Sequence, residues 1–329
     1  MQNVTQASIE QFGELYDRIA RELHNVIVGL DEVIEGVVAG IFCGGHVLLE
    51  GVPGIGKTLL MKSMSTALGL HYKRIQFTPD LMPSDITGTE VLTEDETGRR
   101  AFQFKSGPIF ANVVLADEIN RATPKTQAAL LEAMAERQVT VLDKTYRLPS
   151  PFFVLATQNP IEYEGTYPLP EAQLDRFLLK IWVPSPSMSE LKEVLVRTTS
   201  DNQRVVSPVF SGQNAANTIE AMRGLVRQVV APEPLLDILV RFISMLQPDG
   251  RGTTEMAKRY LRFGPGPRGA QSVLLVSKFY ALRAGRIHIS ADDIQRASVQ
   301  ALRHRVVLNF QAEADGITSD AIILDAFRR

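Results

Sequence analysis

The sequence is poor in cysteine and in metal-ligand patterns, and each shortage excludes a class of protein. Cys43 is the single cysteine among the 329 residues, so neither an internal disulfide nor a thiolate metal cluster can form. It lies in an apolar stretch, which is typical of a small buried side chain. The five histidines lack metal-ligand spacing, and we expect all of them to be structural: His24, His46, His71, His288 and His304.

Charge of one sign and long apolar runs are also lacking. The formal net charge is −2, with acids and bases spread fairly evenly, which argues against a constitutive nucleic-acid binder but leaves room for a local basic groove. No apolar run reaches the ~18 residues that cross a bilayer, and the given sequence does not open on a basic-then-apolar segment. We therefore expect a soluble, cytoplasmic protein without a membrane span.

The most informative segment that is present covers residues 46–58, where a short apolar strand runs straight into a glycine-rich loop. Gly51, Gly54 and Gly56 free the backbone to curl, so successive N–H groups can point at phosphate oxygens. Lys57 can reach the β- and γ-phosphates, and the Thr58 hydroxyl can bind a magnesium ion. A helix that begins at Lys57 adds the positive end of its dipole. An ordinary glycine turn is the alternative, but the strand before the loop and the helical pattern after it favour a nucleoside triphosphate site.

Alternating patterns along the first half of the chain predict a doubly wound sheet with helices on both faces. Helical spacing covers residues 1–24, a second stretch to about Gly40, and Thr123–Gln138. Strands are readable between such patterns, and several are nearly all apolar, as expected for parallel strands buried on both faces. The predicted strands are His46–Leu49, His71–Phe77, Val113–Ala116, Phe152–Ala156 and Leu178–Val183.

A Pro-Ser-Pro segment at residues 184–186 separates this α/β pattern from a strand-poor C-terminal region. The helical patterns beyond it are Met188–Thr198, Ala215–Val229, Pro234–Leu246, Arg268–Arg283 and Ala291–Ala301. We predict two domains, an α/β nucleotide-binding domain over residues 1–186 and a helical domain over residues 187–329.

Two stretches break the alternation and read as β-hairpins, Glu90–Phe104 and Gln138–Leu148. Loops without regular structure are the alternative interpretation for both.

Acidic and polar residues follow two of the predicted strands. Asp117 and Glu118 end one strand, where they would lie at the carboxyl edge of the sheet beside the phosphate loop. Asp117 could join Thr58 around the magnesium ion, and Glu118 could orient or deprotonate the attacking water. Asn159 ends the next strand and could bond the γ-phosphate or that water, although an asparagine before proline also forms ordinary turns.

Two arginines stand where a single subunit would not obviously use them. Arg176 follows a short predicted helix before the last strand, and Arg268 opens a helix of the C-terminal region. An arginine supplied by a neighbouring subunit can neutralise charge on a transferring phosphoryl group, and one on a mobile domain can couple nucleotide state to domain angle. Surface ion pairs are the alternative role for both.

Taken together, these motifs resemble the MoxR family of AAA+ ATPases over about residues 10–305. The resemblance rests on the phosphate loop and on residues 77–85, 107–110, 115–122, 156–160 and 169–177. It implies a five-stranded sheet of order 5-1-4-3-2 with a C-terminal all-α lid. It also implies these roles: Lys57 and Thr58 as the Walker A pair, Asp117 and Glu118 as the Walker B pair, Asn159 as sensor 1, Arg176 as the arginine finger and Arg268 as sensor 2.

The same resemblance implies ATP and Mg²⁺ as ligands and a wider binding set. Val28 and Gly29 fall where such proteins contact adenine, and the phosphate-loop residues are Gly51, Val52, Pro53, Gly54, Ile55, Gly56, Lys57, Thr58 and Leu59. The two hairpins match inserts that can face a central pore. One departure is Gly266, because members of the family often carry a small polar residue before the sensor 2 Pro-Arg.

For function, the resemblance implies a homo-oligomeric ring, a hexamer, that remodels or matures a protein client. A partner with a von Willebrand factor A domain is expected as well. A nucleic-acid motor is one alternative, which the net charge and the acidic residues Glu94, Asp95 and Glu96 at a hairpin tip disfavour despite Arg99 and Arg100. A nucleotide-gated scaffold with incidental turnover is the other.

Overall fold

A parallel five-stranded sheet forms the centre of the computed structural model, which describes residues 5–94, 100–160, 165–201, 204–210, 213–250 and 252–328. The strand order is β2-β5-β8-β1-β9, and every neighbouring pair is parallel. The bounds are β1 His46–Glu50, β2 Tyr72–Gln76, β5 Val113–Asp117, β8 Phe153–Gln158 and β9 Phe177–Trp182. These are the five predicted strands, and their order confirms the order 5-1-4-3-2 when they are counted along the chain.

Alternate residues of the central strands enter two different apolar layers. On β5, Val113 and Leu115 join the larger cluster, and Val114 and Ala116 join the smaller one on the opposite face. The period of two residues along a strand produces this division. The central strands are therefore buried on both faces, as their continuous apolar sequences predict.

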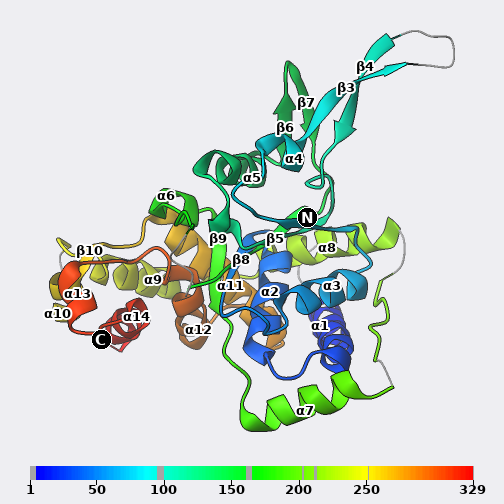
Figure 1. Cartoon of the computed structure of the whole chain (residues 1–329). Helices are drawn as coiled ribbons and strands as arrows, with labels where there is room; N and C mark the ends of the chain where they lie inside the picture. Colours follow the sequence, from blue (N-terminus) through cyan, green and yellow to red (C-terminus); the bar gives the residue numbers. More distant parts are fainter. Residues whose placement is uncertain are drawn as a thin grey trace.

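Helices cover both faces of the sheet (Figure 1). The larger cluster includes α1 Gln6–Val26, α2 Asp31–Cys43 and α3 Lys57–Ala67, and the smaller includes α4 Pro83–Thr87 and α5 Pro124–Glu136. Phe12 of α1 lies with its ring centroid 5.6 Å from that of Phe42 and 5.8 Å from that of Phe279. These aromatic contacts fix the N-terminal helix against both the α/β core and the C-terminal region.

Both predicted hairpins are present and stand side by side away from the body of the molecule (Figure 1). The first pairs β3 Gly88–Glu94 with β4 Arg100–Ser106, and the second pairs β6 Gln138–Val141 with β7 Lys144–Arg147. The rings of Phe104 and Tyr146 stack 4.0 Å apart, and Lys144 Nζ lies 3.2 Å from Glu90 Oε1. The hairpins therefore brace each other. The acidic tip expected from Asp95 and Glu96, with Arg99, lies outside the described residues.

The C-terminal region contains the five predicted helices and further short elements. The helices are α7 Met188–Thr199, α8 Gln213–Gln228, α9 Glu233–Met245, α10 Glu255–Tyr260, α11 Pro267–Arg283, α12 Ala291–Leu302, α13 Phe310–Ala314 and α14 Ser319–Phe327, with α6 Glu171–Leu174 before β9. Helices α10, α13 and α14 have six, five and nine residues, too few for a readable apolar period. A small ladder of β10 Leu261–Phe263 and β11 Val307–Leu308 interrupts the otherwise helical region.

One apolar cluster continues from the sheet into the C-terminal helices. It holds Leu179 and Ile181 of β9 together with Val276 of α11, Ile294 of α12 and Ile322 of α14. The division at residues 186 and 187 therefore crosses a shared core, and the two-domain boundary stays a prediction. In the described part of the chain, no helix has the length and apolar content that a bilayer crossing needs.

His46 at the start of β1 has a structural role. Its Nδ1 accepts a hydrogen bond from the Val154 amide at 3.0 Å, and its Nε2 lies 3.2 Å from the Met134 carbonyl oxygen. These partners require a neutral ring that carries its proton on Nε2. Burial lowers the pKa of His46 to about 4. Among the described residues, no group of three or more His, Cys, Asp or Glu side chains could hold a metal ion.

The buried His46 predicts a loss of stability in mild acid. The pKa of His46 is lower in the folded chain than in the unfolded chain. Below pH ~6.5 the unfolded chain therefore binds a proton at this histidine that the folded chain does not bind. The free energy of unfolding should therefore fall as the pH falls from about 6.5 towards 4, as measured by urea unfolding at several pH values. His46→Gln should reduce this slope, and His71→Gln, at an exposed position, should retain it. An unchanged slope in His46→Gln would contradict the assignment.

Candidate functional site

The glycine-rich loop lies between β1 and α3, at the carboxyl edge of the sheet. Gly54 and Gly56 have φ angles of 81° and 87°, which residues with a side chain rarely adopt, so both positions favour glycine. The α3 helix begins at Lys57, as predicted. Lys57 Nζ donates a hydrogen bond to the Gly51 carbonyl oxygen at 2.5 Å across the loop. Burial lowers the pKa of Lys57, and the nearby carboxylates of Asp117, Glu118 and Glu50 oppose that shift.

Asp117 ends β5 beside this loop and is almost completely buried. Its Oδ1 accepts a hydrogen bond from the Thr157 hydroxyl at 2.7 Å. Its Oδ2 accepts bonds from Arg74 Nε at 3.0 Å and Arg74 Nη2 at 2.6 Å, and it lies 3.5 Å from Thr58 Oγ1. Both oxygens are therefore compensated by donors, as a buried carboxylate requires.

Glu118 follows in a left-handed backbone conformation with φ 57° and ψ 51°. Such a conformation is uncommon for a residue with a side chain and costs on the order of 1 kcal/mol. The Glu118 amide donates to Thr157 Oγ1 at 2.8 Å, so one buried hydroxyl contacts both acidic residues. Glu118 Oε2 accepts hydrogen bonds at 2.9 Å from Gln76 Nε2 and from Arg121 Nη1.

Asn159 comes directly after β8, which lies between the strand of the loop and the strand of the acids. The side chain is buried, and the Gly51 amide donates to the Gln158 carbonyl oxygen at 3.3 Å. The sheet order thus brings the ends of three predicted segments together: the phosphate loop, the acidic pair and the Asn159 turn.

A cavity of about 310 Å³ opens beside the loop, and its lining is largely apolar. Five of the predicted nucleotide-binding residues line it: Val28, Gly54, Ile55, Gly56 and Leu59. Leu191 and Val194 of α7 and the Pro184–Pro186 segment form other walls. Gly29 has a φ of 65°, and a Cβ there would lie 2.1 Å from Glu190 Oε1. The apolar walls and the adjoining phosphate loop suit a flat base with a triphosphate.

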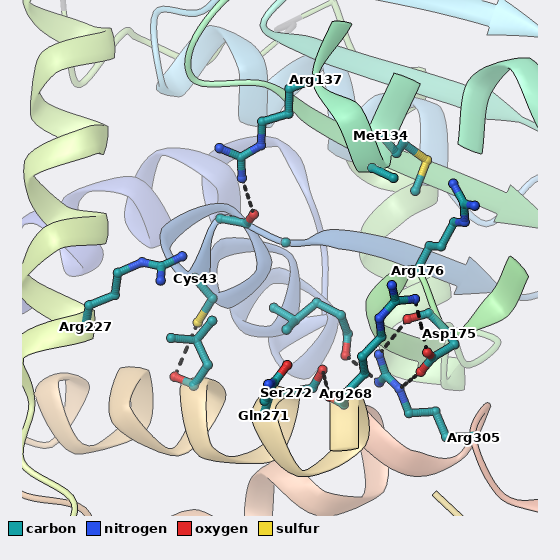
Figure 2. Close-up of a pocket in the computed structure, with 15 residues that line it drawn as sticks. Cys43, Met134, Arg137, Asp175, Arg176, Arg227, Arg268, Gln271, Ser272 and Arg305 are labelled. Atoms are coloured by element: carbon teal, nitrogen blue, oxygen red, sulfur yellow. Dashed lines mark hydrogen bonds and ion pairs between the residues drawn. The ribbon is translucent and has the colours of Figure 1, made fainter. Parts of the chain in front are cut away.

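Arg176 and Arg268 lie together at a different place, around a second cavity of about 480 Å³ (Figure 2). Arg268 Nη1 lies 3.4 Å from Asp175 Oδ2, and Arg305 Nε lies 2.7 Å from Asp175 Oδ1. Arg176 Nη1 donates to the Leu131 carbonyl oxygen at 2.6 Å. Arg137 and Arg227 also line this cavity, whose one acidic lining residue in the described chain is Asp175. The positive excess makes it suitable for an anion.

The sheet geometry separates this arginine cavity from the phosphate loop. Arg176 directly precedes Phe177, which pairs with His46 at the start of β1, whereas the phosphate loop follows Glu50 at the end of that strand. Two ends of a five-residue strand are about 17 Å apart. Among the residues that the structure describes, no residue lines both cavities. The structure therefore does not bring Arg176 or Arg268 to the phosphate loop of their own chain.

Sequence reasoning missed several residues that contact the predicted ones. Thr157, Arg74 and Gln76 contact the acids. Asp175 contacts Arg268, and Arg305 donates to the carbonyl oxygen of Phe177 in β9. A usable signal existed for Thr157, because it lies two residues before Asn159 in a strand already expected beside β5. No local pattern marks Arg74 or Gln76, which look like ordinary polar residues of an edge strand.

The residues at the acidic end of β5 fit a magnesium ion. Mg²⁺ prefers oxygen ligands, commonly one or two protein oxygens together with phosphates and water. The Thr58 hydroxyl and the Asp117 carboxylate converge to 3.5 Å at the start of α3, directly beside the loop. This pair would hold the ion, with nucleotide phosphates supplying further ligands.

The fold and this site define a P-loop ATPase of the AAA class. A family model described as ATPase family associated with various cellular activities (AAA) matches residues 46–179, and an AAA lid domain model matches residues 253–326. The chain is 40% identical to the chaperone MoxR1 of Mycobacterium tuberculosis over 308 residues, which cover 93% of this chain and 79% of that protein. It is 31% identical to the protein MoxR of Methylorubrum extorquens, with 88% of this chain and 87% of that protein covered.

A crystal structure of a Cytophaga hutchinsonii protein is similar along nearly the whole chain. The TM-score is 0.88 at 38% identity, and the match covers 97% of this chain and 95% of the other. The chain therefore belongs to the MoxR family of AAA+ ATPases, as the sequence motifs predicted.

Removal of the Lys57 ammonium should abolish tight nucleotide binding. Lys57→Ala would remove charge-assisted hydrogen bonds to two phosphates, each worth roughly 1.5 kcal/mol or more, so affinity should fall by about 100-fold or more. Fluorescent ATP titration would measure the change. Lys62→Ala, at an exposed position of the same helix, is the matched control and should bind like the parent. Near-normal affinity in Lys57→Ala would rule out this loop as the phosphate site.

Proposed function

We propose that this chain is a magnesium-dependent ATPase that works as a homo-oligomeric ring, a hexamer, and uses ATP hydrolysis to remodel or mature a protein client. The observation that carries the proposal is the placement of two half-sites on opposite edges of one sheet. The phosphate loop, Asp117 and Glu118 lie at the carboxyl edge, and Arg176 lies at the amino edge. Neither half suffices for phosphoryl transfer, and two neighbouring copies would supply both.

Within one subunit, the side chains of the carboxyl edge support in-line attack of water on the γ-phosphorus. Glu118 would accept a proton from that water as the new P–O bond forms, and the bond to the β-phosphate oxygen would break to release ADP. Asn159 would orient the water or contact the γ-phosphate. Lys57 would hold the β- and γ-phosphates, and Mg²⁺ between Thr58 and Asp117 would supply charge neutralisation there.

Between subunits, the arginine cavity would meet the triphosphate of the adjacent copy. Arg176 would contact the γ-phosphate as the arginine finger, and Arg268 would approach the same charge from the start of α11. The excess of arginine over acid in this cavity favours an anionic occupant. A ring is the closed arrangement in which every subunit both gives and receives such an arginine.

The client side of the proposal rests on family membership and on the paired hairpins. Leu92 and Phe102 are cross-strand neighbours on the first hairpin, with exposed fractions of 55% and 69%. Exposed apolar side chains on a projecting element suit contact with another protein. We propose that the hairpins contact the client, and that a protein with a von Willebrand factor A domain is among the partners.

Glu118→Gln should bind ATP and stall. The amide keeps the size of the side chain but cannot accept a proton at neutral pH, so the turnover rate should fall by roughly 100-fold or more while ATP affinity stays near the parent value. Phosphate release and fluorescent ATP binding would be measured on the same preparation, with Glu132→Gln as an exposed control. Turnover at the parent rate would remove Glu118 as the base.

Arg176→Ala should lose hydrolysis but retain ATP at its own loop, and a mixing experiment tests which subunit the arginine serves. Arg176→Ala and Lys57→Ala should each be inactive alone. Mixed one to one, they should recover up to about a quarter of the parent rate, because an intact loop then meets an intact Arg176 from its neighbour at that fraction of interfaces.

The rate per subunit of the parent should rise with protein concentration and with ring mass measured by light scattering. Absence of recovery in co-assembled mixed rings, or activity of Arg176→Ala alone, would contradict a shared site.

A further inference from the structure

Two polar side chains on the edge strand β2 reach across to the acids at the end of β5. In the strand register, Arg74 pairs with Leu115 and Gln76 pairs with Asp117. Residues two positions apart point to the same face of a strand, so Arg74 and Gln76 act on the same side. Arg74 Nη2 donates to Gln76 Oε1, and Gln76 Nε2 donates to Glu118 Oε2 at 2.9 Å. Arg74 therefore contacts Asp117 directly and Glu118 through one amide.

Arg74 does not form the usual fork with both oxygens of the carboxylate. Its Nε and Nη2 both donate to Asp117 Oδ2, at 3.0 and 2.6 Å, while Thr157 holds Oδ1 at 2.7 Å. Oδ2 is also the oxygen that lies 3.5 Å from Thr58 Oγ1. A metal ion held by Thr58 and Asp117 would need the same oxygen, Oδ2. The guanidinium cation at Oδ2 would repel the metal ion and would compete with it for the lone pairs of that oxygen.

The exposure of the two partners differs in a way that permits exchange. The Asp117 side chain is 10% exposed and is fixed by Thr157, whereas the Arg74 side chain is 46% exposed. Because β2 is the edge of the sheet, Arg74 has solvent beside it and can turn away without disturbing another strand. The carboxylate stays in place, and the guanidinium is the partner that can leave.

We infer that Arg74 is a competitor of the divalent ion at Asp117: it neutralises the buried carboxylate when it bonds Oδ2, and it must release Oδ2 before a metal ion can bind between Thr58 and Asp117. The inference rests on the proposed function in one respect, the assignment of Thr58 and Asp117 as the metal pair. Arg74 thus sets the concentration of Mg²⁺ at which the nucleotide site becomes complete.

The test is nucleotide affinity as a function of metal, measured without turnover. Fluorescent ADP would be titrated into the parent and into Arg74→Gln, first with EDTA and then over a series of Mg²⁺ concentrations. Without metal, Arg74→Gln should bind ADP more weakly, because Asp117 then repels the phosphates without a compensating charge. With metal, the Mg²⁺ concentration that gives half of the gain in ADP affinity should be roughly tenfold lower in Arg74→Gln than in the parent. A factor of this size is what the loss of one charge-assisted hydrogen bond produces. The two effects have opposite signs.

A matched control and a second variant make the outcome decisive. Lys73→Gln removes the same charge from the neighbouring exposed position of β2 and should leave the Mg²⁺ midpoint unchanged. Arg74→Lys keeps the charge with fewer donors in a fixed geometry, and it should shift the midpoint in the same direction by less. It also serves if Arg74→Gln fails to fold. A purely structural Arg74 would lower thermal stability in both variants without moving the midpoint, and that result would overturn the inference.

Asp117→Asn separates failure of the inference from failure of the metal site. If Asp117→Asn loses the Mg²⁺ dependence of ADP affinity but Arg74→Gln keeps the parent midpoint, Arg74 is not a competitor and the metal pair stands. If Asp117→Asn keeps the full Mg²⁺ dependence, the metal site itself is wrong and the inference falls with it. Room-temperature electron paramagnetic resonance of free Mn²⁺, compared with ADP alone, gives an independent reading of the shift in metal midpoint between each variant and the parent.

Discussion

The buried carboxylate of Asp117 is the interaction on which the organisation of the site depends. Removal of a carboxylate from water costs several kcal/mol unless partners replace the lost hydration. Thr157 from β8 and Arg74 from β2 supply these partners from the two strands that flank β5. Each partner has further contacts, Thr157 with the Glu118 amide and Arg74 with Gln76. The need to compensate one charge therefore organises side chains from three adjacent strands around the carboxyl edge of the sheet.

The parallel sheet imposes a second constraint, the distance between its two edges. All five strands run in the same direction, so groups at strand ends face one edge and groups at strand starts face the other. Asp117 ends a strand, Glu118 and Asn159 directly follow strands, and Arg176 precedes one. No change of side-chain rotamer spans a strand, because even an extended arginine is much shorter than the roughly 17 Å between its ends. The cooperation between subunits that we propose is a consequence of this geometry.

Asp175 and Arg305 fix one wall of the arginine cavity at the start of β9. Arg305 is buried and donates to the carbonyl oxygens of Asp175 and Phe177 as well as to the Asp175 carboxylate. These bonds hold the start of β9 against α12 and fix the carboxylate that Arg268 contacts from α11. Arg268 itself is far more exposed, so its 3.4 Å contact with Asp175 orients the side chain without immobilising it. Arg305 and Arg268 therefore contact the same carboxylate, that of Asp175. The buried Arg305 holds this carboxylate in place, and the exposed Arg268 is oriented by it.

Much of the fold was predictable because its signals are local. The four inner and opposite-edge strands β1, β5, β8 and β9 are short and mostly apolar, and the loop of residues 51–56 is specified by its own spacing. Glu118 and Arg176 could be proposed for the same reason, since each adjoins a recognisable strand. Arg74 and Gln76 could not, because their importance comes from the register of β2 against β5. Arg137 and Arg227 come from the ends of α5 and α8, about ninety residues apart, and only the packing of the folded chain brings them to one cavity.

The paired hairpins and the acidic edge share one base, which gives the proposed client contact a physical route to the site. The first hairpin follows β2 through α4, and the second follows α5. At their base, the Thr126 hydroxyl on α5 donates to the Leu81 carbonyl oxygen at 2.7 Å. The buried amide of Gln127 donates to the carbonyl oxygens of Ile119, Ala122 and Tyr167, which fixes the turn that follows Glu118. Because the hairpins also stack on each other through Phe104 and Tyr146, a load on either one reaches the same packed base. That base continues into β2, the strand that carries Arg74, so a displacement of the hairpins and the inferred release of Asp117 by Arg74 would be movements of connected parts.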